Sequence, residues 1–133
     1  MLTDRVIEEG TLLVDDDSLS FDIRIPWYRS LPLSCVEGIE VRVDSTSVPA
    51  ADTWIAFGDT TYGLGDLAPL YDEWWTVTDP ARVRVQAPCG FGSGPFEIDV
   101  TLSIRIPYIV ERDRRLVMRE RCVKTLTPGS GSR

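Results

Sequence analysis

The chain has 133 residues, of which 43% are hydrophobic and 26% are charged, and its formal net charge at pH 7 is −7. This composition is typical of a soluble globular protein, and the length suits one domain with one hydrophobic core. The negative charge argues against nucleic-acid binding, because phosphate contacts require a basic surface. No apolar run approaches the roughly 20 residues of a membrane span, and the amino terminus lacks a secretory-signal pattern, which favours the cytoplasm.

The amino-terminal part is predicted to contain two strands with an irregular stretch between them. A short apolar run over residues 11–14 is stopped by three aspartates. Apolar and polar residues then alternate over 18–25, the pattern of a half-buried strand. Pro26 follows, and the chain is predicted to be irregular as far as Cys35, because proline cannot donate to a strand ladder. The alternation returns over 39–43 and predicts the second strand.

The middle of the chain is predicted to contain one short strand and one long irregular segment. Residues 45–52 are rich in Ser, Pro and Ala, which predicts a turn that resists regular pairing. Residues 53–57 read TWIAF and predict a short strand. The polar, glycine-containing segment 58–75 follows, and within it Asp66 is predicted to cap one or two helical turns that end by Tyr71.

The carboxy-terminal part contains the strongest strand pattern. Residues 81–87 predict a strand, the glycine- and proline-rich residues 88–95 a loop, and residues 96–106 the longest alternating run of the chain. From residue 108 two interpretations remain open, a β-hairpin that turns at 112–114 or a short helix that begins at Asp113. The β-branched residues and the all-β surroundings favour the hairpin.

These elements predict an all-β fold, an antiparallel β-sandwich with one long irregular loop that holds a short helix. Residues 1–126 are predicted to form a single domain, and the Gly/Ser-rich residues 127–133 a flexible tail. FDIRIPWY, residues 21–28, resembles LSIRIPYI, residues 102–109. Either the two strands stop at comparable places in two sheets, or two amphipathic strands are alike by chance.

Histidine is absent from the chain, which excludes several kinds of catalytic site. A Ser-His-Asp triad, a Cys-His pair or a histidine metal site cannot be built from this chain alone. Cys35, Cys89 and Cys122 are odd in number and widely separated, which predicts buried thiols rather than a zinc site or a disulfide framework. A cysteine nucleophile would require a lowered pKa.

Other motifs of the chain give weak signals for chemistry. GFGSG at 90–94 lacks the spacing, the following helix and the lysine of a phosphate loop, and predicts a flexible turn. The arginines at 112–121 are interrupted by acidic residues, which favours a solvated hairpin over a phosphate site. Six carboxylates are candidates for a glycosidase-like pair, but their spacing selects none. They are Asp66, Asp72, Glu73, Asp79, Glu97 and Asp99.

Six large aromatic residues lie in or beside the segments predicted to be irregular. They are Trp27, Tyr28, Tyr62, Tyr71, Trp74 and Trp75. Such residues either stack on sugar rings, anchor a protein interface or pack as plugs against the sandwich. An interface is favoured for the set as a whole, because the loops of so small a domain have little room to bury six large rings.

Two segments resemble the small (beta) subunit of bacterial C-glycoside deglycosidases. In the first, FDIRIPWYRSLPLSCVEGIEVRVDSTSVP, a strand enters an aromatic-Tyr-Arg-x-x-Pro-Leu-Ser turn and is followed by an acidic, alternating strand and Val-Pro. In the second, TTYGLGDLAPLYDEWW, a Tyr-x-Leu-x-Asp-Leu pattern leads to Asp-Glu-aromatic-Trp. The resemblance covers residues 18–107 and rests on the order and spacing of these elements. The residues beyond 108 show no match to the family.

The resemblance implies a β-sandwich subunit bound to a larger, sugar-isomerase-like TIM-barrel alpha subunit. That partner is expected to carry a divalent metal, manganese in the family, together with the acid and base residues; no cofactor and no catalytic residue is expected in this chain. The complex is expected to cleave the carbon–carbon bond of 3-keto-glycosides of plant aromatics, such as flavonoids, by elimination, and in some members the O-glycosidic bond. The residues expected to form the surface against the partner are Trp27, Tyr28, Arg29, Pro32, Leu33, Trp74 and Trp75.

Two other functions remain open from the residues themselves. A stand-alone carbohydrate-binding β-sandwich would use exposed, coplanar aromatic rings. A small lyase or glycosidase would use its own carboxylates. Binding of glucosides by the isolated chain would favour the first, and turnover by the isolated chain would favour the second.

Overall fold

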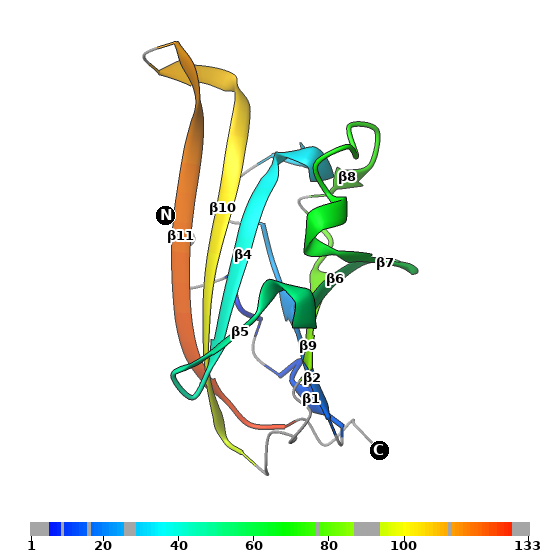
Figure 1. Cartoon of the computed structure of the whole chain (residues 1–133), viewed down its shortest axis with the longest axis vertical. Coiled ribbons are helices and arrows are strands. Elements are labelled where there is room, and N and C mark those ends of the chain that lie inside the picture. Colours follow the sequence, from blue (N-terminus) through cyan, green and yellow to red (C-terminus); the bar gives the residue numbers. More distant parts are fainter. Residues whose placement is uncertain are drawn as a thin grey trace.

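Two antiparallel sheets face each other across an apolar core (Figure 1). This computed structural model describes residues 6–8, 10–15, 17–25, 29–76, 78–86, 94–111 and 113–128. Among these residues, three 3₁₀ turns of three residues each are the only helical elements: Leu33–Cys35, Ala50–Asp52 and Leu64–Asp66. The predicted all-β class is confirmed.

The first sheet has five strands in the order β1-β2-β9-β6-β7. In chain order they are β1 (Leu13–Val14), β2 (Ser18–Ile23), β6 (Thr53–Phe57), β7 (Thr60–Gly63) and β9 (Ala81–Gln86). The second sheet has the order β11-β10-β4-β5, formed by β4 (Val36–Val43), β5 (Thr46–Val48), β10 (Phe96–Glu111) and β11 (Arg114–Leu126). A two-stranded ribbon pairs β3 (Leu31–Pro32) with β8 (Trp74–Trp75).

The core lies between the sheets and follows the alternation seen in the sequence. Phe21 and Ile23 on β2 are fully buried, and so are Val100, Leu102 and Ile104 on β10. Successive side chains of a strand point to opposite faces, so this alternation places one apolar row of each strand in the core. Burial of one such side chain stabilises the fold by about 1.5–3 kcal/mol.

The hairpin predicted near residue 112 is confirmed, and the alternative helix from Asp113 is wrong. β10 and β11 pair from Phe96↔Leu126 to Glu111↔Arg114, which leaves a two-residue turn. Asp113 in this turn has a φ of 67°, a left-handed conformation that aspartate tolerates better than most residues.

Two predictions for the middle of the chain are wrong. Within residues 45–52, Thr46–Val48 do pair regularly with β4, because Asp44 and Ser45 take φ values of 50° and 70° and reverse the chain. Two consecutive positive φ values make the tight turn that joins β4 to β5. Asp66 does not start a helix: it is the last residue of a 3₁₀ turn whose first residue is Leu64, and no side chain caps that turn.

Pro107 does not end its strand, in contrast to the expectation for residues 102–109. β10 continues to Glu111, and its register with β11 shifts between Ile106 and Val110. A proline is tolerated at such an irregularity because no ladder bond requires its missing N–H. β2 ends at Ile23, while Pro26 of the similar stretch 21–28 lies outside the described residues.

Several predicted features lie outside the described residues. These include most of the glycine-rich loop 88–95, with Cys89, and most of the tail 127–133. The division at residue 126 between domain and tail therefore stays a prediction. Within the described ranges, no helix is long and apolar enough to cross a membrane.

Candidate partner interface

The two irregular segments singled out in the sequence meet in space at the β3–β8 ribbon. Leu31 pairs with Trp75, and Pro32 pairs with Trp74. The backbone N–H of Leu33 donates to the carbonyl oxygen of Glu73 at 2.8 Å, which extends the contact beyond the ribbon. Residues about 40 positions apart are thereby held side by side. Because side chains alternate along a strand, the ribbon sends the two adjacent indoles of β8 to opposite faces.

Trp75 points inward and is part of the hydrophobic core. Its side chain is 1% exposed, and its Nε1–H donates to the backbone carbonyl of Asp79 at 3.1 Å. The ring of Phe57 packs against it edge to face, with centroids 5.5 Å apart and planes at 67°, a favoured geometry for aromatic pairs. Trp75 is therefore anchored by packing on one side and by a hydrogen bond on the other.

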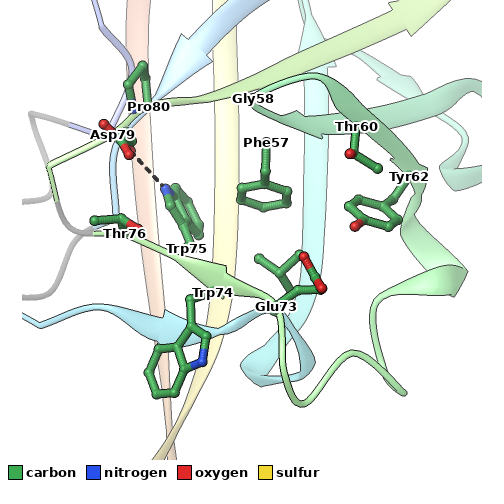
Figure 2. Close-up of a pocket in the computed structure, with 11 residues that line it drawn as sticks. Phe57, Gly58, Thr60, Tyr62, Glu73, Trp74, Trp75, Thr76, Asp79 and Pro80 are labelled. Carbon is green, nitrogen blue, oxygen red and sulfur yellow. Dashed lines mark hydrogen bonds between the residues drawn. The ribbon is translucent and has the colours of Figure 1, made fainter.

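Trp74 points outward, and Tyr71, three residues earlier in the chain, is exposed as well. Trp74 is 56% exposed and Tyr71 is 69% exposed. Figure 2 shows the two indoles on opposite sides of β8, with Trp74 directed away from the sheet. Exposed Trp and Tyr are enriched at protein interfaces, where burial of a large ring stabilises the complex. We call Tyr71, Trp74 and the adjoining cavity the Trp74 surface.

The cavity beside Trp74 has a volume of about 230 Å³ and combines aromatic walls with carboxylates (Figure 2). Phe57, Tyr62, Trp74 and Trp75 supply the rings, and Glu73 and Asp79 supply the carboxylates. Aromatic faces and negative charge together attract cations such as the guanidinium of arginine. Phe57 and Tyr62 are brought here by the β6–β7 hairpin, whose turn begins at Gly58 with a φ of 62°.

The structure places the seven predicted interface residues differently from one another. Trp74 is exposed, Arg29 is exposed and Pro32 is half-buried. Leu33 and Trp75 are each 1% exposed, so these two lie beneath the surface and support it from below. Trp27 and Tyr28 lie outside the described residues.

Sequence reasoning missed two parts of this surface. The sequence pattern predicts only a strand at Phe57, although this residue forms one wall of the cavity. Tyr71 is one of the six aromatics but not one of the seven predicted interface residues, although it is among the most exposed large hydrophobic residues of the described chain. The three aromatics of Tyr71–Trp75 and the two aromatics of TWIAF were the available signal.

Two of the side chains considered for chemistry, Asp99 and Cys35, have defined surroundings. The guanidinium of Arg121 donates to both carboxylate oxygens of Asp99, at 3.0 and 2.7 Å, and holds the pKa of that carboxyl below its usual range. Burial raises the pKa of the Cys35 thiol, although Arg105 opposes the shift, so the thiolate needed for nucleophilic attack is disfavoured. No group of three or more Cys, Asp or Glu side chains suited to a metal ion occurs among the described residues.

Comparison with known proteins identifies the family. The family model described as the C-glycoside deglycosidase beta subunit matches residues 7–108, which include β3, β8 and the walls of the cavity. The chain belongs to this family. The resemblance noted in the sequence is thereby confirmed.

Relatives similar to this beta-subunit family member span most of its length. A 3'-dehydrocarminate deglycosidase beta subunit from a Microbacterium species is 38% identical over 120 residues, 90% of each chain. C-glycoside deglycosidase beta subunits from Microbacterium trichothecenolyticum and Arthrobacter globiformis are 34% and 33% identical, each over 95% of this chain and 96% of the relative. A protein of this family is a beta subunit and thus part of an enzyme complex.

Proposed function

We propose that this chain is the non-catalytic beta subunit of a hetero-oligomeric C-glycoside deglycosidase and that the Trp74 surface binds the larger alpha subunit. The observation that carries the proposal is the exposure of Trp74 in the wall of an aromatic cavity, together with the exposed Tyr71, in a chain whose family members are named as beta subunits. Large exposed rings stabilise a subunit contact when they are withdrawn from water.

The catalytic centre is proposed to lie in the alpha subunit, a TIM barrel that holds a divalent metal such as manganese and the acid and base residues. The substrate is a 3-keto-glycoside of a plant aromatic. Its keto group acidifies the neighbouring C–H of the sugar, so that a base removes this proton and elimination breaks the bond between sugar and aglycone. The aglycone carbon takes up a proton as it leaves; the same route applies to an O-glycoside. A cytoplasmic location is part of this proposal.

The acidic cavity is proposed to take up a basic side chain of the alpha subunit. The Glu73 carboxylate makes no hydrogen bond or ion pair to any residue that the structure describes, and it lies among the rings of the cavity. A guanidinium entering the cavity would contact a carboxylate and aromatic faces together, and the two contacts would bind it more tightly than either contact alone.

Co-expression with the larger subunit tests the proposal. With an affinity tag on this chain, the alpha subunit is expected to co-purify, and the complex to elute as one species in size-exclusion chromatography. Cleavage of a 3-keto-C-glycoside is expected only when both subunits are present. A chain that stays monomeric beside its alpha subunit would overturn the proposal, and so would full activity of the alpha subunit alone.

A further inference from the structure

A tryptophan stands on the outer face of the five-stranded sheet, where polar residues are the rule. Trp54 on β6 alternates with the buried Ile55 and so faces away from the core. The strand register places Arg84 of β9 on one side of it and Gly63 of β7 on the other. Ser20 of β2 follows Arg84 in the same row across the sheet. Because Gly63 has no side chain, the indole is open on that side, and Trp54 is partly exposed.

Two adjoining cavities of about 370 and 330 Å³ lie over this row and form one groove. They share Trp54, Thr61 and Arg84. The first is completed by Gln86, and the second extends toward Asp15, where β1 meets β2. We call this the Trp54 groove. It has no lining residue in common with the cavity of the Trp74 surface.

Three polar side chains of the Trp54 groove are available to a ligand. Arg82, on the same strand, is held by an ion pair with Asp22 at 3.0 Å and by a hydrogen bond to Ser20 Oγ at 2.9 Å. By contrast, the side chains of Arg84, Gln86 and Thr61 make no hydrogen bond or ion pair with any described residue. The guanidinium, the amide and the hydroxyl around the indole thus have no hydrogen-bond partner among the described residues. Ligand-binding sites commonly combine an apolar wall with a few such polar groups.

We propose that the Trp54 groove binds the pyranose ring of a neutral sugar. A pyranose has an apolar face of C–H groups, which packs on an indole, and a rim of hydroxyls that both donate and accept hydrogen bonds. Arg84 supplies donors, Asp15 supplies acceptors, and Gln86 and Thr61 supply both.

The charges of the groove favour a neutral ligand over an anion. Two arginines, Arg82 and Arg84, face two carboxylates, Asp15 at the end of the groove and Asp22 beside Arg82. An anion would gain from Arg84 but would be repelled by Asp15, whereas a sugar hydroxyl uses both. The site is independent of the proposed partner contact, and its test is made on this chain alone.

Titration of the purified full-length chain with methyl β-glucoside tests the site. Saturation-transfer NMR and calorimetry are expected to show saturable binding. Trp54→Ala should weaken binding at least tenfold and Arg84→Gln several-fold, whereas Trp54→Phe, which keeps an aromatic face, should retain most of it. Trp74→Ala is the matched control and should leave the affinity unchanged. Circular dichroism checks that each variant is folded. If Trp54→Ala does not fold, Arg84→Gln and Trp54→Phe still test the site.

Three results would overturn the proposal. The first is the absence of saturable binding by the wild-type chain. The second is binding that Trp74→Ala abolishes and Trp54→Ala or Arg84→Gln leaves intact, which would move the site to the other surface. The third is tighter binding of benzoate than of the glucoside, which would make the groove an anion site. None of these results changes whether the chain associates with an alpha subunit.

Discussion

Trp75 and Phe57 pack edge to face with their ring centroids 5.5 Å apart, so that the partly buried Phe57 packs against a core residue and both rings line the cavity of the Trp74 surface. Phe57 also contacts Tyr62 at a centroid distance of 6.3 Å, so three rings from β6, β7 and β8 form a continuous aromatic layer. The layer holds β8 in place, and β8 in turn presents Trp74 to solvent. The stability of the subunit and the shape of its proposed interface therefore depend on the same residues.

Replacement of the buried indole should destabilise the subunit strongly. Trp75→Ala removes a fully buried ring together with its hydrogen bond to Asp79, and truncations of this kind cost about 3–5 kcal/mol. Urea unfolding followed by circular dichroism measures the loss. Trp74→Ala is the control, because exposed substitutions usually change stability by within about 0.5 kcal/mol. Equal stability of the two variants would contradict the assigned burial.

Replacement of the exposed indole should weaken association with the alpha subunit. Trp74→Ala is expected to raise the dissociation constant about 30-fold or more, the loss of about 2 kcal/mol typical of an interface hot spot. Calorimetric titration of the alpha subunit measures it. Val117→Ala, which alters an exposed hydrophobic residue on β11, is the matched control and should have little effect. A larger effect at Val117 than at Trp74 would place the interface on the four-stranded sheet that contains β11.

Removal of the cavity charge should make association less sensitive to salt. Glu73→Gln keeps the shape of the side chain but removes the carboxylate, so a basic partner side chain loses its counter-charge. The expected result is about fivefold weaker association at low salt, with a difference that shrinks as the salt concentration rises. Titrations at three ionic strengths measure how the dissociation constant of each variant changes with salt. If Glu73→Gln and wild type showed the same salt dependence, a charged occupant of the cavity would be excluded, but the proposed contact through Trp74 would not.

Stability should depend on pH through Asp99. Its pKa is lowered in the folded state, first by hydrogen bonding to Arg121, so the ionised carboxylate stabilises the fold above the unfolded pKa near 3.8. This contribution is lost as the pH falls through the lower folded-state pKa. Asp99→Asn should therefore be less stable than wild type at pH 7, with the gap narrowing below pH 3.8.

Urea unfolding at pH 7, 5 and 3 measures the effect of Asp99→Asn. Glu40→Gln is the control, because Glu40 and Arg119 form an exposed ion pair at 3.3 Å, and such pairs contribute little. A stability gap for Asp99→Asn that is the same at all three pH values would show that the carboxylate is not linked to folding.

A change in the β4–β5 turn should stabilise the protein. Ser45 adopts a φ of 70°, which glycine takes without steric cost, and Asp-Gly is a favoured pair for this turn. The backbone carbonyl of residue 45, which accepts from Arg42, is retained in Ser45→Gly. The gain is a few tenths of a kcal/mol, because the greater freedom of glycine in the unfolded chain offsets part of it. Thermal unfolding measures it, and a lower midpoint would contradict the assigned turn.

The strands were predictable because their side chains report the two faces of a sheet directly. The strand at 53–57 appears with the predicted bounds, and the alternating apolar positions from Phe96 to Ile106 are all buried, although Asp99 between them is buried as well. Turn chemistry was harder to predict. Asp44–Ser45 is a less common pair for a two-residue turn than Asp-Gly or Asn-Gly, and β5 that follows it is only three residues long.

The residues of the candidate sites were only partly predictable. Trp74 and Trp75 are neighbouring tryptophans that the sequence alone does not distinguish. Which of them is buried depends on the pairing of β8 with Leu31 and Pro32, about 40 residues away. Trp54 was predicted only as part of a strand, and its role in a groove depends on Arg84 and Gly63 lying beside it on other strands. Cross-strand neighbours are set by long-range register, which a local pattern does not contain.

The sequence by itself determined the all-β class, the positions of the main strands and the lack of any histidine for catalysis. Each of these follows from residue identity or from a period of two along the chain. Only the tertiary structure decided which aromatic rings are exposed, that two irregular segments join at the β3–β8 ribbon, and that a groove lies over Trp54. The physical reason is that exposure is a property of packing: a side chain is buried by residues far away in the sequence, and the fold alone brings them together.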